Sequence, residues 1–227
     1  MSKTKLPLRS IAIAAIAVLA LSVWYVTRDG GSPQQTTFDT TGTSDAVTAA
    51  SDTEARPDLF IGHADAPIEV VEYASFTCPH CGNFHKSVYP QLKANFIDTG
   101  KVKFVFREVY FDKFGLWAGM LARCGGEDRY FGLVDLLLKK QDEWARGSSD
   151  ADVVSKMFRL GRQAGITDDQ MNTCMGDNDL AQALVADFQL KAGQDQVTAT
   201  PTFFVNGEKM SNMSYEDFEI VLNERLD

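Results

Sequence analysis

Residues 68–81 read IEVVEYASFTCPHC and decide the fold, because a β-rich run leads there through a short turn to two cysteines. The segment Ile68–Tyr73 is rich in β-branched and aromatic residues, which predicts a strand. Beyond the cysteines, apolar residues recur at four-residue spacing, which predicts a helix that Pro90 kinks. Cys78 and Cys81 therefore stand where a strand passes into the first turn of a helix.

The rest of the chain continues in the same alternating way. Residues 101–109 alternate apolar with more polar side chains and predict a second strand. The period is helical from about residue 114 to residue 193, and strand character returns at residues 202–205. Asn206-Gly207 predicts a turn, and Ser214 opens a terminal helix. This order predicts an α/β unit that a block of helices interrupts.

The spacing of Cys78 and Cys81 points to redox chemistry. At the start of a helix, the first sulfur faces unpaired backbone N–H groups and the positive end of the dipole, which lowers its pKa. His80, between the two cysteines, adds a candidate donor or cation, and Pro79 fits the first helical turn. A stabilised thiolate favours the reduced pair, so the disulfide form is a stronger oxidant.

Other uses of this motif are weaker. A plain structural disulfide remains an alternative. A zinc site needs four ligands, and only His80 and His85 lie nearby in the sequence. Attachment of haem needs a histidine directly after the second cysteine, where this chain has Gly82. We therefore expect the two sulfurs to act without a metal or a cofactor.

Two segments together resemble a known family. Residues 71–81, VEYASFTCPHC, look like the active-site strand and helix start of DsbA-like periplasmic thiol-disulfide oxidoreductases. Residues 198–207, TATPTFFVNG, resemble that family's cis-proline loop and the strand after it. The resemblance implies a thioredoxin fold over residues 57–113 and 193–227, with an inserted helical subdomain over residues 114–192.

The resemblance also implies roles for individual residues. Cys78 is expected to be the exposed nucleophile and Cys81 its buried partner. Pro201 is expected to be cis and to pack against the disulfide, while the backbone of Thr200 offers hydrogen bonds to a substrate chain. Glu72, six residues before the first cysteine, matches an acidic residue thought to move protons for the inner cysteine.

A buried carboxylate at position 72 needs a partner, and Lys103 on the neighbouring strand is the candidate. A solvated edge position for Glu72 is the alternative. His63 and His85 have no partner spacing, and we expect them at the surface or in turns.

The implied function is donation of the Cys78–Cys81 disulfide to reduced, unfolded exported proteins, through a mixed disulfide at Cys78. The family implies a quinone-linked membrane partner of the DsbB type that reoxidises the pair. Thr200 departs from the Val that is familiar in oxidising members and is common in isomerase-type relatives. A reductase or isomerase using the same site is therefore an alternative, and a chaperone-like peptide-binding protein is another.

Cys124 and Cys174 both fall in the helical block. Leftover cysteines of an exported protein tend to pair, and some DsbA-like proteins have a comparable second disulfide, so we expect a structural bridge. Free buried thiols and a redox relay are the alternatives.

The N-terminus predicts export. Residues 1–28 hold Lys3, Lys5, Arg9 and Arg28 but no acid, and residues 10–27 form an uncharged, largely apolar run. This run is expected to be a membrane anchor or a cleaved signal, which leaves the rest of the chain in the periplasm. Residues 29–56 are rich in small polar residues and predict a flexible linker.

Composition limits the class of partner. Hydrophobic residues make up 44% of the chain, enough for a packed core. The 31 acidic side chains outnumber the 22 basic ones and give a net charge of −9. Such an acidic surface repels phosphate backbones, so we expect no nucleic-acid binding. The linker is too short and polar to be a dimerisation module, and we expect a monomer.

Overall fold

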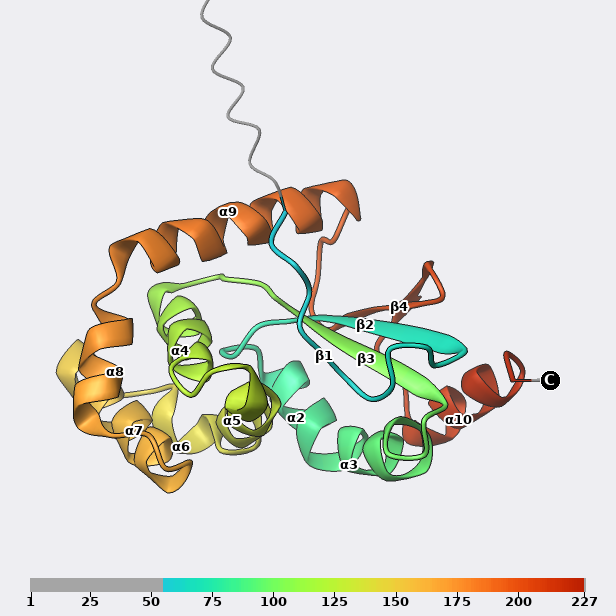
Figure 1. Ribbon diagram of the computed structural model, residues 1–227, viewed down its shortest axis with the longest axis horizontal. Coiled ribbons are helices and arrows are strands. Elements are labelled where there is room, and N and C mark those ends of the chain that lie inside the picture. Colours follow the sequence, from blue (N-terminus) through green and yellow to red (C-terminus); the bar gives the residue numbers. More distant parts are fainter. Residues whose placement is uncertain (1–54, 227) are drawn as a thin grey trace, which may run out of the picture. The chain divides into compact units, whose positions relative to one another are not determined.

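The computed structural model describes residues 55–226, and Figure 1 shows their arrangement. The predicted leader, residues 1–28, lies outside the described residues, and so do residues 29–54 of the predicted linker. The elements in chain order are β1 (Phe60–Ile61), β2 (Ile68–Ala74), α2 (Pro79–Ser87), α3 (Tyr89–Leu92), the π-helix η1 (Lys93–Ile97), β3 (Val102–Glu108), α4 (Lys113–Arg123), α5 (Glu127–Lys139), α6 (Gln141–Trp144), α7 (Asp150–Gln163), α8 (Asp168–Met175), α9 (Asn178–Gln194), β4 (Thr202–Val205), β5 (Glu208–Ser211) and α10 (Tyr215–Asn223).

A five-stranded sheet in the order β1-β3-β2-β4-β5 forms the centre of the fold. β2 and β3 run parallel, while the other neighbouring strands pair antiparallel. β2 is the middle strand, and six of its seven residues are buried. Its largely apolar composition follows from this position, because helices cover both faces of the sheet.

The helices form layers on the two sides of the sheet. α9 lies along one face, and α2, α3 and α10 lie on the other (Figure 1). Helices α4 to α9 lie between β3 and β4 in the chain, and α4 to α8 gather beyond one end of the sheet (Figure 1). This is a thioredoxin-like α/β fold with a helical insertion.

Alternation along β2 sends neighbouring side chains to opposite faces. Val70 and Phe104 belong to the main core, on the side of α2, α3 and α10. Val71, Tyr73 and Val105 belong to a smaller cluster, which packs with Phe188 of α9. The residue at position 72 is therefore directed toward the helix that carries the cysteines.

The main predicted strands and helices are present, and the differences have local causes. The helix after the cysteines ends at Ser87 and resumes at Tyr89, so the break lies just before Pro90, which has no N–H to donate. The short strands β1 and β5 and the single turn α6 escaped prediction. Each is only two to four residues long and has no clear periodic pattern.

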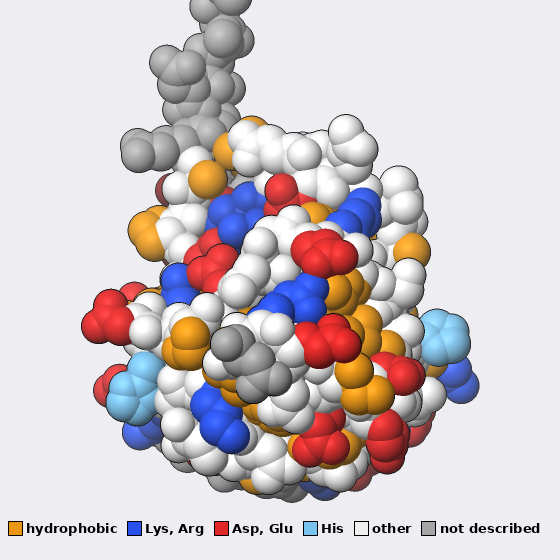
Figure 2. Space-filling model, turned by 90° about the vertical axis from the view of Figure 1, so that its right-hand side faces the viewer, with side chains coloured by type: hydrophobic (Ala, Val, Ile, Leu, Met, Phe, Trp, Pro, Cys, Tyr) orange, Lys and Arg blue, Asp and Glu red, His pale blue; other side chains and the backbone are white. Residues whose placement is uncertain are grey.

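Figure 2 shows acidic, basic and apolar side chains interspersed over the face at the α10 end of the fold. Among residues 55–226, no helix combines the length and apolar character needed to cross a bilayer.

Candidate active site

Cys78 is the N-cap of α2, and Pro79 occupies the first helical position. The Cys78 N–H donates to the carbonyl of Ser75 over 3.1 Å, and the Cys78 carbonyl accepts from the Gly82 N–H over 3.1 Å. No side chain caps this helix, so its first N–H groups are left facing the Cys78 sulfur. The local sequence thus places a thiol where an anion is favoured.

The two cysteines have different surroundings. Both are free thiols in this structure, and Cys81 is fully buried. Cys78 was expected to be exposed, but it is only 8% exposed, because it is packed under the loop that carries Thr200. The Cys78 Sγ donates to the carbonyl oxygen of Thr200 over 3.4 Å, and the Thr200–Pro201 peptide bond is cis. The fold therefore brings the loop at residues 200–201 against the first cysteine, as the motif pair predicts.

The pKa values of the two thiols diverge. A hydrogen bond from Cys81 lowers the pKa of Cys78 to about 5, against the effect of burial and with help from Thr200 and the N–H groups of Cys81 and His80. Burial raises the pKa of Cys81 well above its ordinary range, and the hydrogen bond with Cys78 and the charge of Glu72 raise it further. The surroundings therefore favour the thiolate form of Cys78 and the protonated form of Cys81.

His80 is exposed on the first turn of α2. Its backbone N–H is among the groups that lower the pKa of Cys78. His80, two residues after Cys78, thus serves the site through its main chain.

The predicted partner of Glu72 is wrong. Lys103 bonds to Glu69 over 2.7 Å, whereas Glu72 is fully buried and its Oε2 lies 2.9 Å from Nε2 of His85. The cause is strand alternation: Glu69 lies opposite Lys103 in the parallel register, while Glu72 lies opposite Phe106 and faces the other way. Lys103 therefore cannot reach the carboxylate at position 72.

His85 corrects a second expectation, because it is 1% exposed instead of lying at the surface or in a turn. It follows Cys81 by four residues on α2, so both face the sheet one turn apart. That spacing in the sequence could have indicated a buried histidine under the cysteine.

Gln141 is a site residue that sequence reasoning missed. Its Nε2 donates to the carbonyl of Phe76 over 2.7 Å and to that of Cys78 over 2.9 Å. These bonds join the insertion to the turn that carries the first cysteine. The sequence holds no signal for them, because α6 is a single turn.

Cys124 and Cys174 form a disulfide in this structure, with Cα atoms 5.7 Å apart. The bridge joins the end of α4 to α8 within the insertion. Phe76, two residues before Cys78, is fully buried, and Phe114 and Trp117 of α4 are partly buried against the core.

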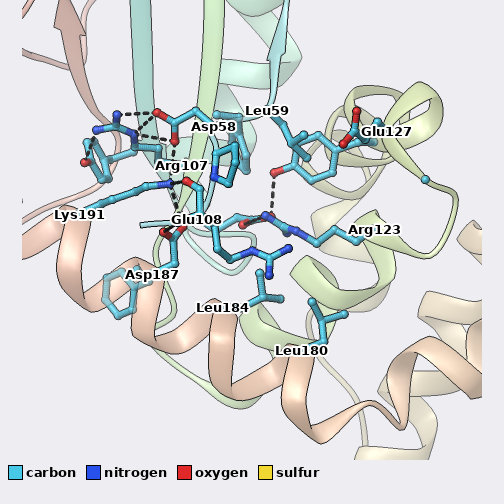
Figure 3. A pocket seen from close by; sticks show the side chains of 17 residues that line it. Asp58, Leu59, Arg107, Glu108, Arg123, Glu127, Leu180, Leu184, Asp187 and Lys191 are labelled. Carbon is cyan, nitrogen blue, oxygen red and sulfur yellow. Dashed lines mark hydrogen bonds and ion pairs between the residues drawn. The ribbon is translucent and has the colours of Figure 1, made fainter. Parts of the chain in front are cut away.

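A cavity of about 390 Å³ lies between the sheet, α5 and α9, and its lining contains neither active-site cysteine (Figure 3). Its charged side chains bind one another. Arg107 bonds to Asp58 over 2.6 Å, Lys191 bonds to Asp58 over 2.9 Å, and Arg123 bonds to Glu108 over 2.7 Å. These pairs hold the start of the domain and the insertion against the sheet, so we assign the cavity no chemistry.

The chain has relatives with named functions. A family model described as thioredoxin matches residues 54–224. A Rickettsia bellii protein named as a protein-disulfide oxidoreductase is 34% identical over 171 residues, which are 75% of this chain and 65% of that protein. Disulfide bond formation protein D of Bacillus subtilis is 26% identical over 195 residues, covering 81% of this chain and 82% of that one.

A solved structure extends the likeness. The crystal structure of alpha-DsbA1 from Wolbachia pipientis has a TM-score of 0.68 and 30% sequence identity to this chain, over 74% of this chain and 89% of that one. The match of the family model, this likeness in sequence and fold, and the cysteine pair beside a cis-proline loop agree with one another. The chain therefore belongs to the DsbA-like branch of the thioredoxin family.

Proposed function

We propose that this protein is a thiol-disulfide oxidoreductase that donates the Cys78–Cys81 disulfide to reduced proteins exported from the cell. The observation that carries this proposal is the divergence of the two thiols, with the pKa of Cys78 lowered to about 5 and that of Cys81 raised. At neutral pH the reduced pair holds a stabilised thiolate, so giving up the disulfide is favourable. The names of the Rickettsia and Bacillus relatives support the same class of activity.

The reaction proceeds in two exchanges. A client thiolate attacks Sγ of Cys78; the Cys78–Cys81 bond breaks, and the sulfur of Cys81 leaves and takes a proton. The client's second thiolate then attacks the client sulfur of the mixed disulfide and releases Cys78 as a thiolate. The client is oxidised by two electrons, and the cysteine pair is reduced by two.

The groups around Cys78 fit this sequence of steps. The N–H groups at the start of α2 stabilise the thiolate that the second exchange releases. Thr200 and Pro201 lie beside the attacked sulfur, where the main chain of an extended client can pair with the loop. The proposed site residues are thus Cys78, Cys81, His80, Glu72, Thr200 and Pro201.

The cycle needs a reoxidant and a location. We infer that a quinone-linked membrane partner of the DsbB type restores the disulfide. We also infer that the domain acts as a monomer in the periplasm, where residues 10–27 tether it to the inner membrane. The Cys124–Cys174 bridge is consistent with an oxidising compartment.

The equilibrium with glutathione tests the direction of the reaction. A reduction potential of about −120 to −180 mV supports donation, and a value near −270 mV supports a reductase in its place. Thr200 is the residue that favours the second outcome. Oxidation of a reduced two-cysteine peptide, compared between the wild type and Cys78→Ser, tests whether this pair carries the activity; equal rates would remove the proposal.

A further inference from the structure

Beneath the cysteines, three ionisable side chains extend in a row from the core to the surface. Glu72 of β2 is fully buried, His85 of α2 is 1% exposed, and the side chain of Asp135 of α5 is 28% exposed. Oε2 of Glu72 lies 2.9 Å from Nε2 of His85, and Nδ1 of His85 lies 3.6 Å from Oδ1 of Asp135. Both ring nitrogens thus face a carboxylate, one buried and one that reaches solvent.

The inner end of this row lies under Cys81. Cys81 and His85 are one helical turn apart on α2, and Glu72 acts on Cys81 through its charge. Oε1 of Glu72 is buried and makes no hydrogen bond, although its other oxygen is bonded to His85. A buried carboxylate oxygen without a partner is costly, and a role in accepting and passing a proton accounts for it.

The outer end is held open to solvent. Nζ of Lys139 bonds to Asp135 over 2.8 Å, one turn along α5, and orients the carboxylate. Oδ1 of Asp135 and Nδ1 of His85 are just beyond hydrogen-bonding distance, so a small movement of the Asp135 side chain joins them. Aromatic rings of Phe84, Tyr89 and Phe106 surround the imidazole and exclude water from the other directions.

We propose that His85 and Asp135 conduct a proton between solvent and Glu72, and that this path protonates the sulfur of Cys81 as it leaves the disulfide. The inference rests on the proposed function, since it concerns the same pair of cysteines. The protonated imidazole of His85 gives its Nε2 proton to the carboxylate of Glu72, which passes a proton on to Cys81. The neutral ring keeps its Nδ1 proton, and after a change of tautomer that moves this proton to Nε2, Nδ1 takes up a new one from solvent by way of Asp135. No atom other than the proton changes partner in these transfers.

The need for such a path follows from the chemistry of the leaving group. A thiol of raised pKa leaves slowly as a bare thiolate, and Cys81 has no exposed surface through which water could supply a proton. A proton delivered as the sulfur–sulfur bond breaks removes that obstacle. His85 is then a positioning and proton-transfer group that acts on Cys81 through Glu72.

The groups that set the charge of His85 can be named from every side. Glu72 on β2 and Asp135 on α5 act on its charge, the ring of Tyr89 on α3 packs against it, and Cys81 lies one turn away on its own helix. Burial lowers the pKa of His85, but the two carboxylates outweigh burial and raise that pKa overall. The two carboxylates therefore favour the protonated imidazole, which can pass a proton on.

The test is the rate at which dithiothreitol reduces the Cys78–Cys81 disulfide of the full chain, followed by alkylation and mass shift. This reaction breaks the same bond and needs no client, so it remains informative if the proposed function fails. The quantity compared is the ratio of the His85→Gln rate to the wild-type rate from about pH 5.5 to about pH 9, in which ionisation of the reductant cancels.

We expect this ratio to be about 0.1 or less at pH values below the raised pKa of His85. At pH values above that pKa the ratio should approach one, because His85 of the wild type then has no proton to pass on. Asp135→Asn is expected to slow the reaction at neutral pH and to shift the change in ratio to lower pH. The matched control is Asp152→Asn, which breaks a similar lysine pair at i,i+4 on α7 and is expected to leave the rate unchanged.

A ratio of one at every pH, or a loss that does not vary with pH, would overturn the proposal. Circular dichroism and thermal unfolding verify that each variant is folded. If His85→Gln does not fold, the comparison of Asp135→Asn with Asp152→Asn decides, and equal pH profiles for these two would also overturn it.

Discussion

The sulfur of Cys78 lies 3.4 Å from the carbonyl oxygen of Thr200, although 122 residues separate the two in the chain. The contact exists because β2 and β4 are neighbours in the sheet, so the turn after one strand meets the loop before the other. An attacked sulfur and a main-chain acceptor for a client are thereby brought to one place. Cys81, three residues along the helix, is fully buried, whereas Cys78 keeps 8% of its surface exposed.

The first prediction concerns the reactivity of Cys78. We expect iodoacetamide to alkylate the reduced protein with a half-maximal rate near pH 5, because the pKa of this thiol is lowered to about 5. Free cysteine reaches its half-maximal rate near pH 8.5, at about its ordinary pKa. Mass spectrometry of the alkylated peptide identifies the reacting sulfur.

The control for this measurement is Cys78→Ser. We expect Cys81 in that variant to stay unmodified at pH 7, because it is fully buried and its pKa is raised. A half-maximal rate for Cys78 near pH 8.5 would contradict the assignment of this sulfur as the nucleophile.

A second prediction concerns Glu72→Gln and the stability of the fold. Removing one partner of a buried ion pair destabilises proteins by about 3 kcal/mol, so we expect a loss of that size at pH 6. The pKa of His85 is raised in the folded state, so its contribution is fully present below its unfolded value of 6.5 and is lost as pH rises through the folded pKa. The difference in the free energy of unfolding between wild type and variant should therefore shrink with rising pH.

Urea unfolding from about pH 5.5 to about pH 9 measures this difference. Glu69→Gln is the matched control, since Glu69 is on the same strand but pairs with Lys103 on the opposite face, where it is half exposed. We expect that variant to change stability by less than about 1 kcal/mol. A difference for Glu72→Gln that grows with pH would show that the pair is not charged as described.

A third prediction concerns Gln141→Ala. This change leaves two buried carbonyl groups without their donor, so we expect a loss of about 2 kcal/mol in the free energy of unfolding. One of these carbonyls belongs to Cys78, so client oxidation should slow as the turn loosens. Gln91→Ala removes an exposed glutamine of α3 whose side chain bonds only to the carbonyl of Ser87, and it should change neither quantity. Equal effects of the two variants would show that Gln141 does not support the site.

The sequence supports prediction of the redox site better than prediction of what lies beneath it. The roles expected for Cys78, Cys81 and Pro201 rest on two short motifs in which each residue type has a specific chemical task. The strands β2, β3 and β4 follow from apolar patterns that any buried strand must have. Such features are local, so they can be identified without knowledge of the tertiary fold.

The partner of Glu72 shows where this reasoning ends. Glu69 and Glu72 are an odd number of residues apart, so alternation alone places them on opposite faces and separates Glu72 from Lys103. The choice of His85 depends, however, on how α2 packs on β2, and no local pattern specifies that packing. Gln141 is a stronger case, because its two bonds cross between the insertion and the cysteine turn and come from a helix of a single turn.

The last prediction separates stability from redox chemistry in the second pair of cysteines. The Cys124–Cys174 bridge closes a loop with a sequence separation of 50, and the chain-entropy model assigns such a loop about 4 kcal/mol. We expect the double variant Cys124→Ala/Cys174→Ala to lose roughly that amount in urea unfolding. Its potential against glutathione should equal that of the wild type, because the bridge lies within the insertion and neither of its cysteines pairs with Cys78 or Cys81. A shifted potential with unchanged stability would mean that electrons pass between the two pairs, and the bridge would then be part of the redox machinery.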